Sequence, residues 1–213
     1  MVPVPVPVPE DVSLLVRVLA GNPATGVSTL FCLAAADTCA LRRLHPAVAG
    51  AVAIVPWADT ATPVVDAVRW RAALPAAVGA RLEDRVVAGL LSSDAAVATV
   101  LAGITCLRLP ACDAVTDAVL LRLPTSLRTL DVRGCRTLTA RASFGHLTVL
   151  ASLDCSETKF AVAGLPPSLQ ELNISIFDFM TSVSLALLRR LRVLRASGSA
   201  LNDDTLASLP PNL

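Results

Sequence analysis

The chain has 213 residues, of which 54% are hydrophobic, 16% are charged and only 3% are aromatic, and its formal net charge is +1. This near-neutral charge gives no overall field to attract nucleic acid or an acidic membrane, and the few aromatic rings offer little surface for base stacking. We therefore expect neither partner. The composition indicates an aliphatic core, which suits the thin layers of a repeat protein.

The cysteines and histidines are too dispersed for a metal site. No two of the six cysteines form a C-x-x-C pair, and neither histidine lies within five residues of a cysteine. A zinc site needs clustered ligands, so we expect no metal and no catalytic cysteine–histidine pair. A phosphate-loop spacing at residues 21–28 has Val27 in place of the essential lysine. The sequence thus predicts a non-enzymatic protein without cofactors, with free thiols in the reducing cytoplasm.

Residues 1–10 begin the chain with the alternating sequence MVPVPVPVPE. Alternating proline forbids a helix and predicts an extended polyproline II arm. The segment has no basic start followed by an apolar helix, so we do not expect it to be a signal peptide. The longest uncharged stretch, residues 18–36, contains glycine and proline and predicts no membrane span.

Residues 11–57 are expected to be helical. Apolar residues at helical spacing predict helices over 11–20, 29–36 and 38–44, with Asp37 as the N-cap of the last and Pro46 as its stop. A small apolar stretch, residues 47–55, then leads to Pro56 and Trp57.

This segment resembles an F-box. The resemblance rests on its order of Pro-Glu, Leu-Leu-x-x-Val-Leu, Ala-Asp-x-x-Ala-Leu-Arg-Arg-Leu and a final Trp. It implies a Skp1-like adaptor bound through Leu14, Leu15, Leu19, Leu41 and Leu44. The alternative is a plain helical cap over the open end of a solenoid, which repeat folds require.

Residues 58–103 are interpreted as a linker with one degenerate repeat. Residues 64–73 and 82–91 are compatible with helix or strand, and Trp70 is expected to anchor the core. Residues 94–101 predict a helix that ends near Gly103.

Residues 104–213 carry a repeated motif, clearest as L-x-x-L-x-V-x-x-C-x-x-L at residues 127–138. Five units share inward positions that alternate along a strand. The first inward position is held by Ile104, Leu127, Leu150, Leu169, Leu191 and Leu213, and the second by Leu107, Leu130, Leu153, Leu172 and Leu194. The third inward position is held by Leu109, Val132, Cys155, Ile174 and Ala196. A turn position after the strand is held by Cys112, Cys135, Thr158, Phe177 and Ser199.

The spacing of 19–23 residues between first positions is similar to that of the leucine-rich repeat family. The resemblance implies an α/β solenoid with a parallel sheet on its concave face and an N-terminal cap or F-box-like region. Helices are expected over 116–123 and 203–209, each ended by proline. The chain stops where a further strand would begin, so we expect it to continue or to expose an association-prone end.

The outward side chains of the strands form what we call the sheet face. We expect a protein partner there, and adjacent Asp131 and Asp154 to be bridged by Arg108 and Arg133. The alternative is an ordinary solvated sheet. The candidate binding residues are Arg108, Thr129, Asp131, Arg133, Ser152, Asp154, Ser156, Glu171, Asn173, Ser175 and Arg195.

These features predict a protein-interaction scaffold, in its sharpest form an F-box-like substrate adaptor of a ubiquitin ligase. The alternative is a structural or surface leucine-rich repeat protein whose N-terminal helices only cap the solenoid.

Overall fold

The structure is a computed structural model, and it describes residues 43, 46–90, 93–139, 141–158, 164–176, 185–199, 207, 209, 210 and 213. In chain order the elements are α4 (Pro46–Ala53), β1 (Pro63–Val64), α5 (Ala67–Ala73), β2 (Gly79–Leu82), α6 (Asp84–Leu90), α7 (Asp94–Val100), β3 (Cys106–Arg108), α8 (Asp117–Leu120), β4 (Thr129–Asp131), β5 (Ser152–Asp154), β6 (Glu171–Asn173), the 3₁₀ helix η1 (Leu185–Leu187) and β7 (Val193–Arg195).

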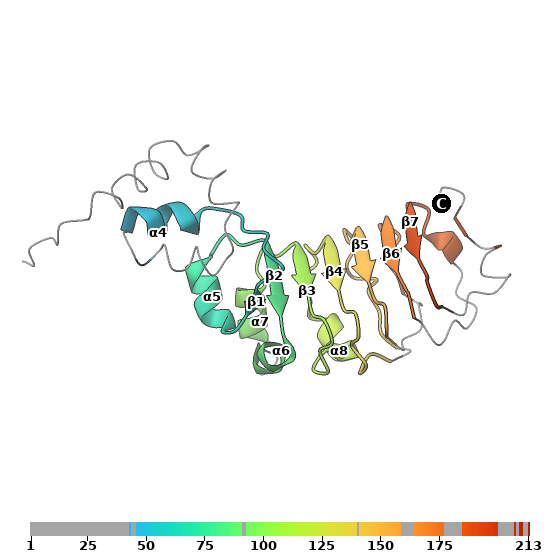
Figure 1. The fold of residues 1–213 in the computed structure, drawn as a ribbon, viewed down its shortest axis with the longest axis horizontal. Helices are drawn as coiled ribbons and strands as arrows, with labels where there is room; N and C mark the ends of the chain where they lie inside the picture. Colours follow the sequence, from blue (N-terminus) through green and yellow to red (C-terminus); the bar gives the residue numbers. More distant parts are fainter. Residues whose placement is uncertain are drawn as a thin grey trace, which may run out of the picture.

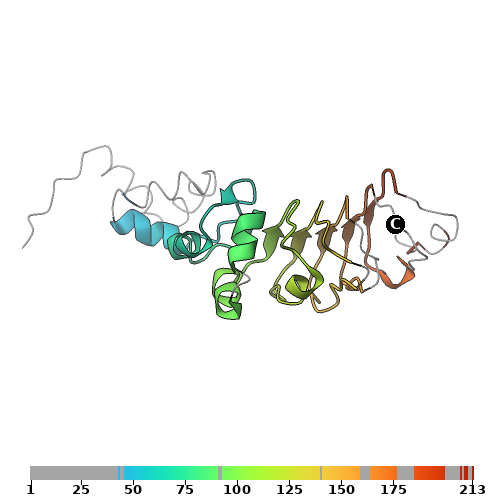
Figure 2. The same ribbon diagram turned by 90° about the horizontal axis from the view of Figure 1, so that it is seen from below.

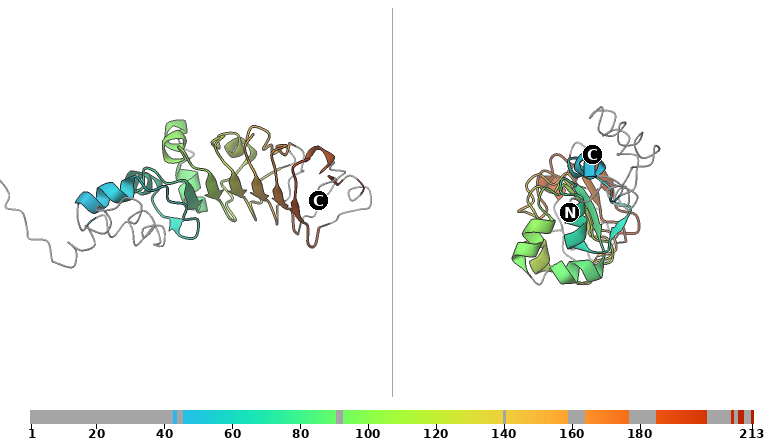
Figure 3. Two further views of the ribbon diagram at one scale, coloured as in Figure 1. Left: turned by 90° about the horizontal axis from the view of Figure 1, so that it is seen from above. Right: turned by 90° about the vertical axis from the view of Figure 1, so that its left-hand side faces the viewer.

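The strands form one parallel sheet in the order β1 to β7, so every strand lies beside the next one in the chain (Figure 1). The strands and the segments that return between them make successive rungs of an elongated stack (Figure 2). Viewed from the N-terminal side, successive repeats overlie one another (Figure 3). This arrangement confirms the predicted α/β class and the predicted sequential parallel sheet.

The register of the sheet confirms the repeat alignment. Leu107 pairs with Leu130, Leu130 with Leu153, Leu153 with Leu172 and Leu172 with Leu194. Leu107, Leu130, Leu153 and Leu172 are at most 1% exposed. They belong to a single apolar cluster that runs from Val64 to Leu191. Each fully buried leucine contributes roughly 1.5–3 kcal/mol relative to an exposed one. The aliphatic layers therefore hold the stack together.

Each repeat approaches its strand through the same four-residue leading turn. The amide of the first inward residue donates to the carbonyl three residues earlier, for example Leu127 to Pro124 at 3.2 Å and Leu169 to Pro166 at 3.2 Å. In these two turns the serine before the leucine, Ser126 or Ser168, donates its hydroxyl to the first-position carbonyl of the preceding repeat. The recurring Pro-x-Ser-Leu phrase thus satisfies buried backbone groups.

The trailing turn, which leaves the strand, also repeats. In five successive repeats the residue two positions after the third inward residue has a positive φ: Ala111, Gly134, Glu157, Ile176 and Gly198. Glycine adopts this conformation without strain, whereas a β-branched side chain there is an outlier. Ile176 is therefore the most strained residue of this series.

The sheet extends further toward the N-terminus than the leucine pattern shows. Strand β2 pairs with β3 so that Ala80 occupies the second inward position opposite Leu107. The ambiguous stretch 64–73 forms the end of β1 and α5, and 82–91 forms the end of β2 and α6. The small residues and the longer spacing from Ala80 to Leu107 conceal this repeat in the sequence.

The two predicted helices in the described part of the chain differ in length. Helix α7 matches its prediction, with Ser93 as N-cap and Gly103 at φ +69° beyond its end. Helix α8 is shorter than residues 116–123, because Arg122 and Leu123 hydrogen-bond to carbonyls only three residues back. Such tight bonds close a turn and do not continue an α-helix.

The N-terminal end of the stack is closed by α4 and the segment after it. Val48, Val52, Val55 and Trp57 form a second apolar cluster with Leu74 and Ala77. The Trp57 carbonyl accepts from the amides of Val78 and Gly79 at the start of β2. In Figure 1, α4 lies beyond the β1 end of the sheet.

A buried arginine fastens this end to the first repeats. Arg71 of α5 is 9% exposed, and its guanidinium donates to the carbonyls of Val100, Pro75 and Ala77 at 2.8, 3.0 and 3.1 Å. Burial lowers the pKa of Arg71, but arginine remains charged in proteins. It therefore ties α5, the first leading turn and the end of α7 together.

Several sequence predictions fall on residues that the structure does not describe. These are the proline arm, the helices at 11–20 and 29–36, all but residue 43 of the helix at 38–44, most of the helix at 203–209, and the turn residue Phe177. Among the described residues, no helix is long and apolar enough to cross a membrane.

Replacing Ile176 by glycine should stabilise the protein. The substitution removes the strain of a β-branched residue at φ +57° and sacrifices a side chain that is 60% exposed. We expect the free energy of unfolding to rise by about 1 kcal/mol after the cost of glycine's greater freedom in the unfolded chain. Urea denaturation measures this change, with Ile176→Ala as the control that shortens the side chain but keeps the strain. An equal gain in both variants would contradict the backbone explanation.

Candidate protein-interaction face

The sheet face gathers all eleven candidate binding residues on one surface. The register aligns a first column of Cys106, Thr129, Ser152 and Glu171, and a central column of Arg81, Arg108, Asp131, Asp154, Asn173 and Arg195. Arg133, Ser156 and Ser175 follow the strands in adjacent trailing turns, linked by backbone hydrogen bonds. The structure thus brings these residues together, and their role in binding remains a prediction.

One oxygen of each short polar side chain in the central column is used within its own repeat. Asp131 Oδ1 accepts from the Arg133 amide at 3.0 Å, and Asp154 Oδ1 accepts from the Ser156 amide at 3.0 Å. Asn173 Oδ1 accepts from the Ser175 amide at 3.1 Å. This bond, from a side chain to the amide two residues on, is an Asx turn. These three residues therefore hold the trailing turns as well as facing solvent.

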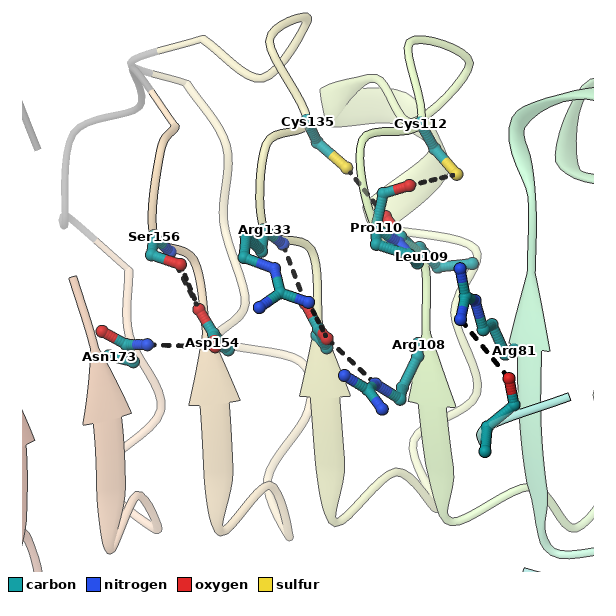
Figure 4. A network of polar contacts seen from close by, with 12 residues as sticks. Arg81, Arg108, Leu109, Pro110, Cys112, Arg133, Cys135, Asp154, Ser156 and Asn173 are labelled. Carbon is teal, nitrogen blue, oxygen red and sulfur yellow. Dashed lines mark hydrogen bonds and ion pairs between the residues drawn. The ribbon is translucent and has the colours of Figure 1, made fainter. Parts of the chain in front are cut away.

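The second carboxylate oxygen, Oδ2, of Asp131 and of Asp154 accepts from a neighbouring side chain, and this relieves the repulsion between the two carboxylates. Asp131 and Asp154 are register partners, but Asp131 Oδ2 faces Arg108 Nε at 3.1 Å and Arg133 Nη2 at 3.7 Å. Asp154 Oδ2 instead accepts from Asn173 Nδ2 at 3.0 Å (Figure 4). The predicted bridging by arginine thus holds for Asp131, whereas the neutral amide of Asn173 serves Asp154.

Arginine side chains supply the accessible charge at the N-terminal half of the sheet face. The side chains of Arg81, Arg108 and Arg133 are 35%, 36% and 42% exposed, whereas that of Asp131 is only 9% exposed. Arg81 was missed by sequence reasoning because its repeat lacks the leucine pattern. It donates to the Ala61 carbonyl at 3.3 Å (Figure 4). It also lies 3.9 Å from Glu83 Oε1.

The other candidates differ in their accessibility. Arg195 and Glu171 are exposed, while Ser156 is buried and donates its hydroxyl to Asp154 Oδ1 at 2.7 Å. Ser152 lies next to Glu171, with 3.4 Å between Oγ and Oε2. Of the eleven candidates, Glu171 and Arg195 are thus the most exposed.

The turn-position cysteines act as hydrogen-bond donors. Cys135 Sγ lies 3.1 Å from the Leu109 carbonyl of the preceding repeat, and Cys112 Sγ lies 3.6 Å from the Leu82 carbonyl. Ser199 makes the equivalent contact with Ile174. Burial raises the pKa of Cys112 to about 12 and that of Cys135 to about 11. Both thiols are therefore neutral near pH 7 and are poor nucleophiles.

The described part of the chain offers no cluster of metal ligands. It contains no cluster of three or more histidine, cysteine or acidic residues that could hold a metal. His146 lies in the segment that returns from β4 to β5, away from the sheet face, and its ring nitrogens make no hydrogen bond within the described structure. Models of known protein families and curated protein sequences give no match to this chain.

The raised thiol pKa values predict a loss of stability at high pH. A group whose pKa is raised on folding stabilises the protein fully below its unfolded pKa, and this contribution disappears as the pH approaches the folded pKa. For Cys135 the window runs from the ordinary value of 9.0 to about 11. Cys135→Ser keeps the donor and removes the titration. Urea midpoints should therefore fall less between pH 8 and pH 10.5 in Cys135→Ser than in the wild type. Equal falls would refute the assignment.

Proposed function

We propose that this protein is a non-catalytic scaffold that binds a protein partner on the sheet face. The observation that carries the proposal is the central column, whose side chains are held in place by hydrogen bonds from strand to strand. A surface that is ordered before binding loses little conformational entropy when a partner docks. The exposed arginines favour a partner with complementary acidic groups.

We further propose that the repeats are of the leucine-rich type. Support comes from the 19–23 residue spacing, from leucine at the buried positions of successive parallel strands, and from return segments that end in proline. In this interpretation the sheet face corresponds to the concave recognition surface that the family resemblance implies.

The N-terminal segment has two candidate functions. The F-box resemblance supports adaptor binding through Leu14, Leu15, Leu19, Leu41 and Leu44, all of which lie outside the described residues. The second candidate is a cap, and it is favoured by the cluster of Val48, Val52, Val55 and Trp57 against the first repeat. The two functions are compatible if residues before 46 bind the adaptor and residues 46–57 close the stack.

Charge reversal on the sheet face should abolish partner capture. The test compares quantitative affinity capture by the wild-type chain and by the double variant Arg133→Glu/Arg195→Glu. We expect specific partners to be depleted at least about tenfold, because a like-charge contact replaces an attraction. The control is Arg141→Glu, which reverses an exposed charge in a return segment. Depletion by the control to the same degree, or by neither variant, would overturn the proposal.

Truncation separates the adaptor and cap functions. Deleting residues 1–42 retains the second apolar cluster, so thermal unfolding should be nearly unchanged while capture of Skp1 is lost. Deleting residues 1–57 removes four of the six residues of that cluster and should unfold the first repeats. In the full chain, Leu15→Asp and Leu41→Asp should each abolish Skp1 capture. Absence of capture by the wild type would rule out the adaptor function.

A further inference from the structure

The leading turn before β7 displays two adjacent arginines. Its hydrogen bond joins the Leu191 amide to the Leu188 carbonyl at 2.9 Å, and both leucines are buried at 0% and 3% exposure. Arg189 and Arg190 occupy the two middle positions of this turn and are exposed. Buried anchors on both sides therefore fix where the two guanidinium groups leave the surface.

No other leading turn carries charge at these two positions. The corresponding pairs in the earlier repeats are Pro75 and Ala76, Ala102 and Gly103, Thr125 and Ser126, Thr148 and Val149, and Pro167 and Ser168. Ser126 and Ser168 use their hydroxyls to satisfy carbonyls of the preceding repeat. Arg190 takes the place of that serine, so the fold does not require an arginine there.

Arg192 and Gln170 complete a polar hollow beside this turn. They hold equivalent positions in neighbouring repeats, immediately before β7 and β6, and the Arg192 amide donates to the Gln170 carbonyl at 2.8 Å. Together with Arg189 and Arg190 they line a hollow of about 720 Å³. Side chains from one leading turn and from the residues that precede two successive strands thus line the same space.

The described residues that line this hollow carry charge of one sign. They are three arginines and Gln170, with no acidic residue among them, although the whole chain has a net charge of only +1. Within the described structure, none of the ion pairs involves Arg190 or Arg192. Clustered guanidinium groups repel one another, and an anion that bridges them removes that cost.

We propose that this hollow binds a phosphate monoester. Guanidinium groups match phosphate oxygens with paired hydrogen bonds, and several arginines can share the three terminal oxygens of one dianion. The amide of Gln170 adds a neutral donor at the rim. A phosphorylated serine or threonine of the scaffold's partner is the source that fits best. The choice of a protein partner as the source of the phosphate rests on the proposed protein-binding function. The prediction that the hollow binds a phosphate group does not.

Calorimetric titration of the full-length chain tests the site. The probes are N-acetyl-O-phosphoserine amide and a glycine-flanked phosphoserine peptide, both at constant ionic strength, with the unphosphorylated peptide as reference. We expect saturable binding of the two phosphorylated probes only. Arg190→Glu/Arg192→Glu should weaken it at least about tenfold, because two of the cations that pair with the phosphate are reversed.

A matched control separates a local site from general charge attraction. Arg128→Glu/Arg136→Glu changes the net charge by the same amount, and Arg128 holds the position of Arg192 in an earlier repeat. This variant should bind like the wild type. Equal weakening in both double variants, or binding of the unphosphorylated peptide, would overturn the proposal.

NMR spectroscopy of the wild type tests the site if the charge-reversed variant does not fold. Binding of the phosphoserine peptide should shift the side-chain signals of Arg190 and Arg192 and leave those of Arg128 in place. Unchanged signals at Arg190 and Arg192 would refute the site. Preferential binding to phosphatidylcholine vesicles that contain a phosphoinositide would overturn a protein source. Loss of partner capture in Arg133→Glu/Arg195→Glu with phosphate binding intact would show that the two surfaces act independently.

Discussion

Buried backbone groups must be hydrogen-bonded, and this requirement governs both turns of every repeat. Before strands β2 to β7, the amide of the first inward residue closes a four-residue leading turn, as in Leu127 with Pro124. After strands β3 to β7, a residue of positive φ redirects the chain. A thiol or hydroxyl such as Cys135 or Ser199 then satisfies a carbonyl of the preceding repeat. With both turns fixed, the inward side chains stack in register and the outward side chains form aligned columns.

The sheet face combines structural and accessible groups in the same column. Asp131, Asp154 and Asn173 each use one oxygen to hold a trailing turn. Their remaining atoms connect neighbouring strands through Arg108 and the Asn173 amide. A surface built in this way is rigid, because moving one side chain breaks a bond that the fold itself uses. In the proposed function, the longer arginine side chains would supply most of the specificity.

Much of the fold follows from the sequence because leucine recurs at the second inward position of strands β3 to β7. Leu130, Leu153 and Leu172 predict the register correctly, and the donor role of Cys112 and Cys135 follows from their place after the strand. Strand β2 was not recognised, because Gly79 and Ala80 carry no apolar pattern and Arg81 therefore had no assigned column. The short length of α8 was also missed, since tight turns and α-helices share the same apolar spacing in so few residues.

The columns of the sheet face were predictable, but their hydrogen bonds were not. Spacing places Asp131 beside Asp154, yet which oxygen faces which neighbour depends on side-chain rotation in three dimensions. The arginines that line the hollow before β7 could not be assigned to a common site from the sequence for a different reason. Arg189, Arg190 and Arg192 are unremarkable surface charges in the sequence, and their convergence becomes visible only when the leading turns of all repeats are compared.

The carbonyl-bound guanidinium of Arg71 has a consequence for mechanical load. In a stack where each repeat contacts only its neighbours, a force applied to the two ends acts on all repeats in series, and the weakest repeat detaches first. Arg71 joins three separate segments at the N-terminal end, so that end resists shear as one unit. Under a pulling force the protein should therefore unfold repeat by repeat from the β7 side, with α5 and α7 separating last.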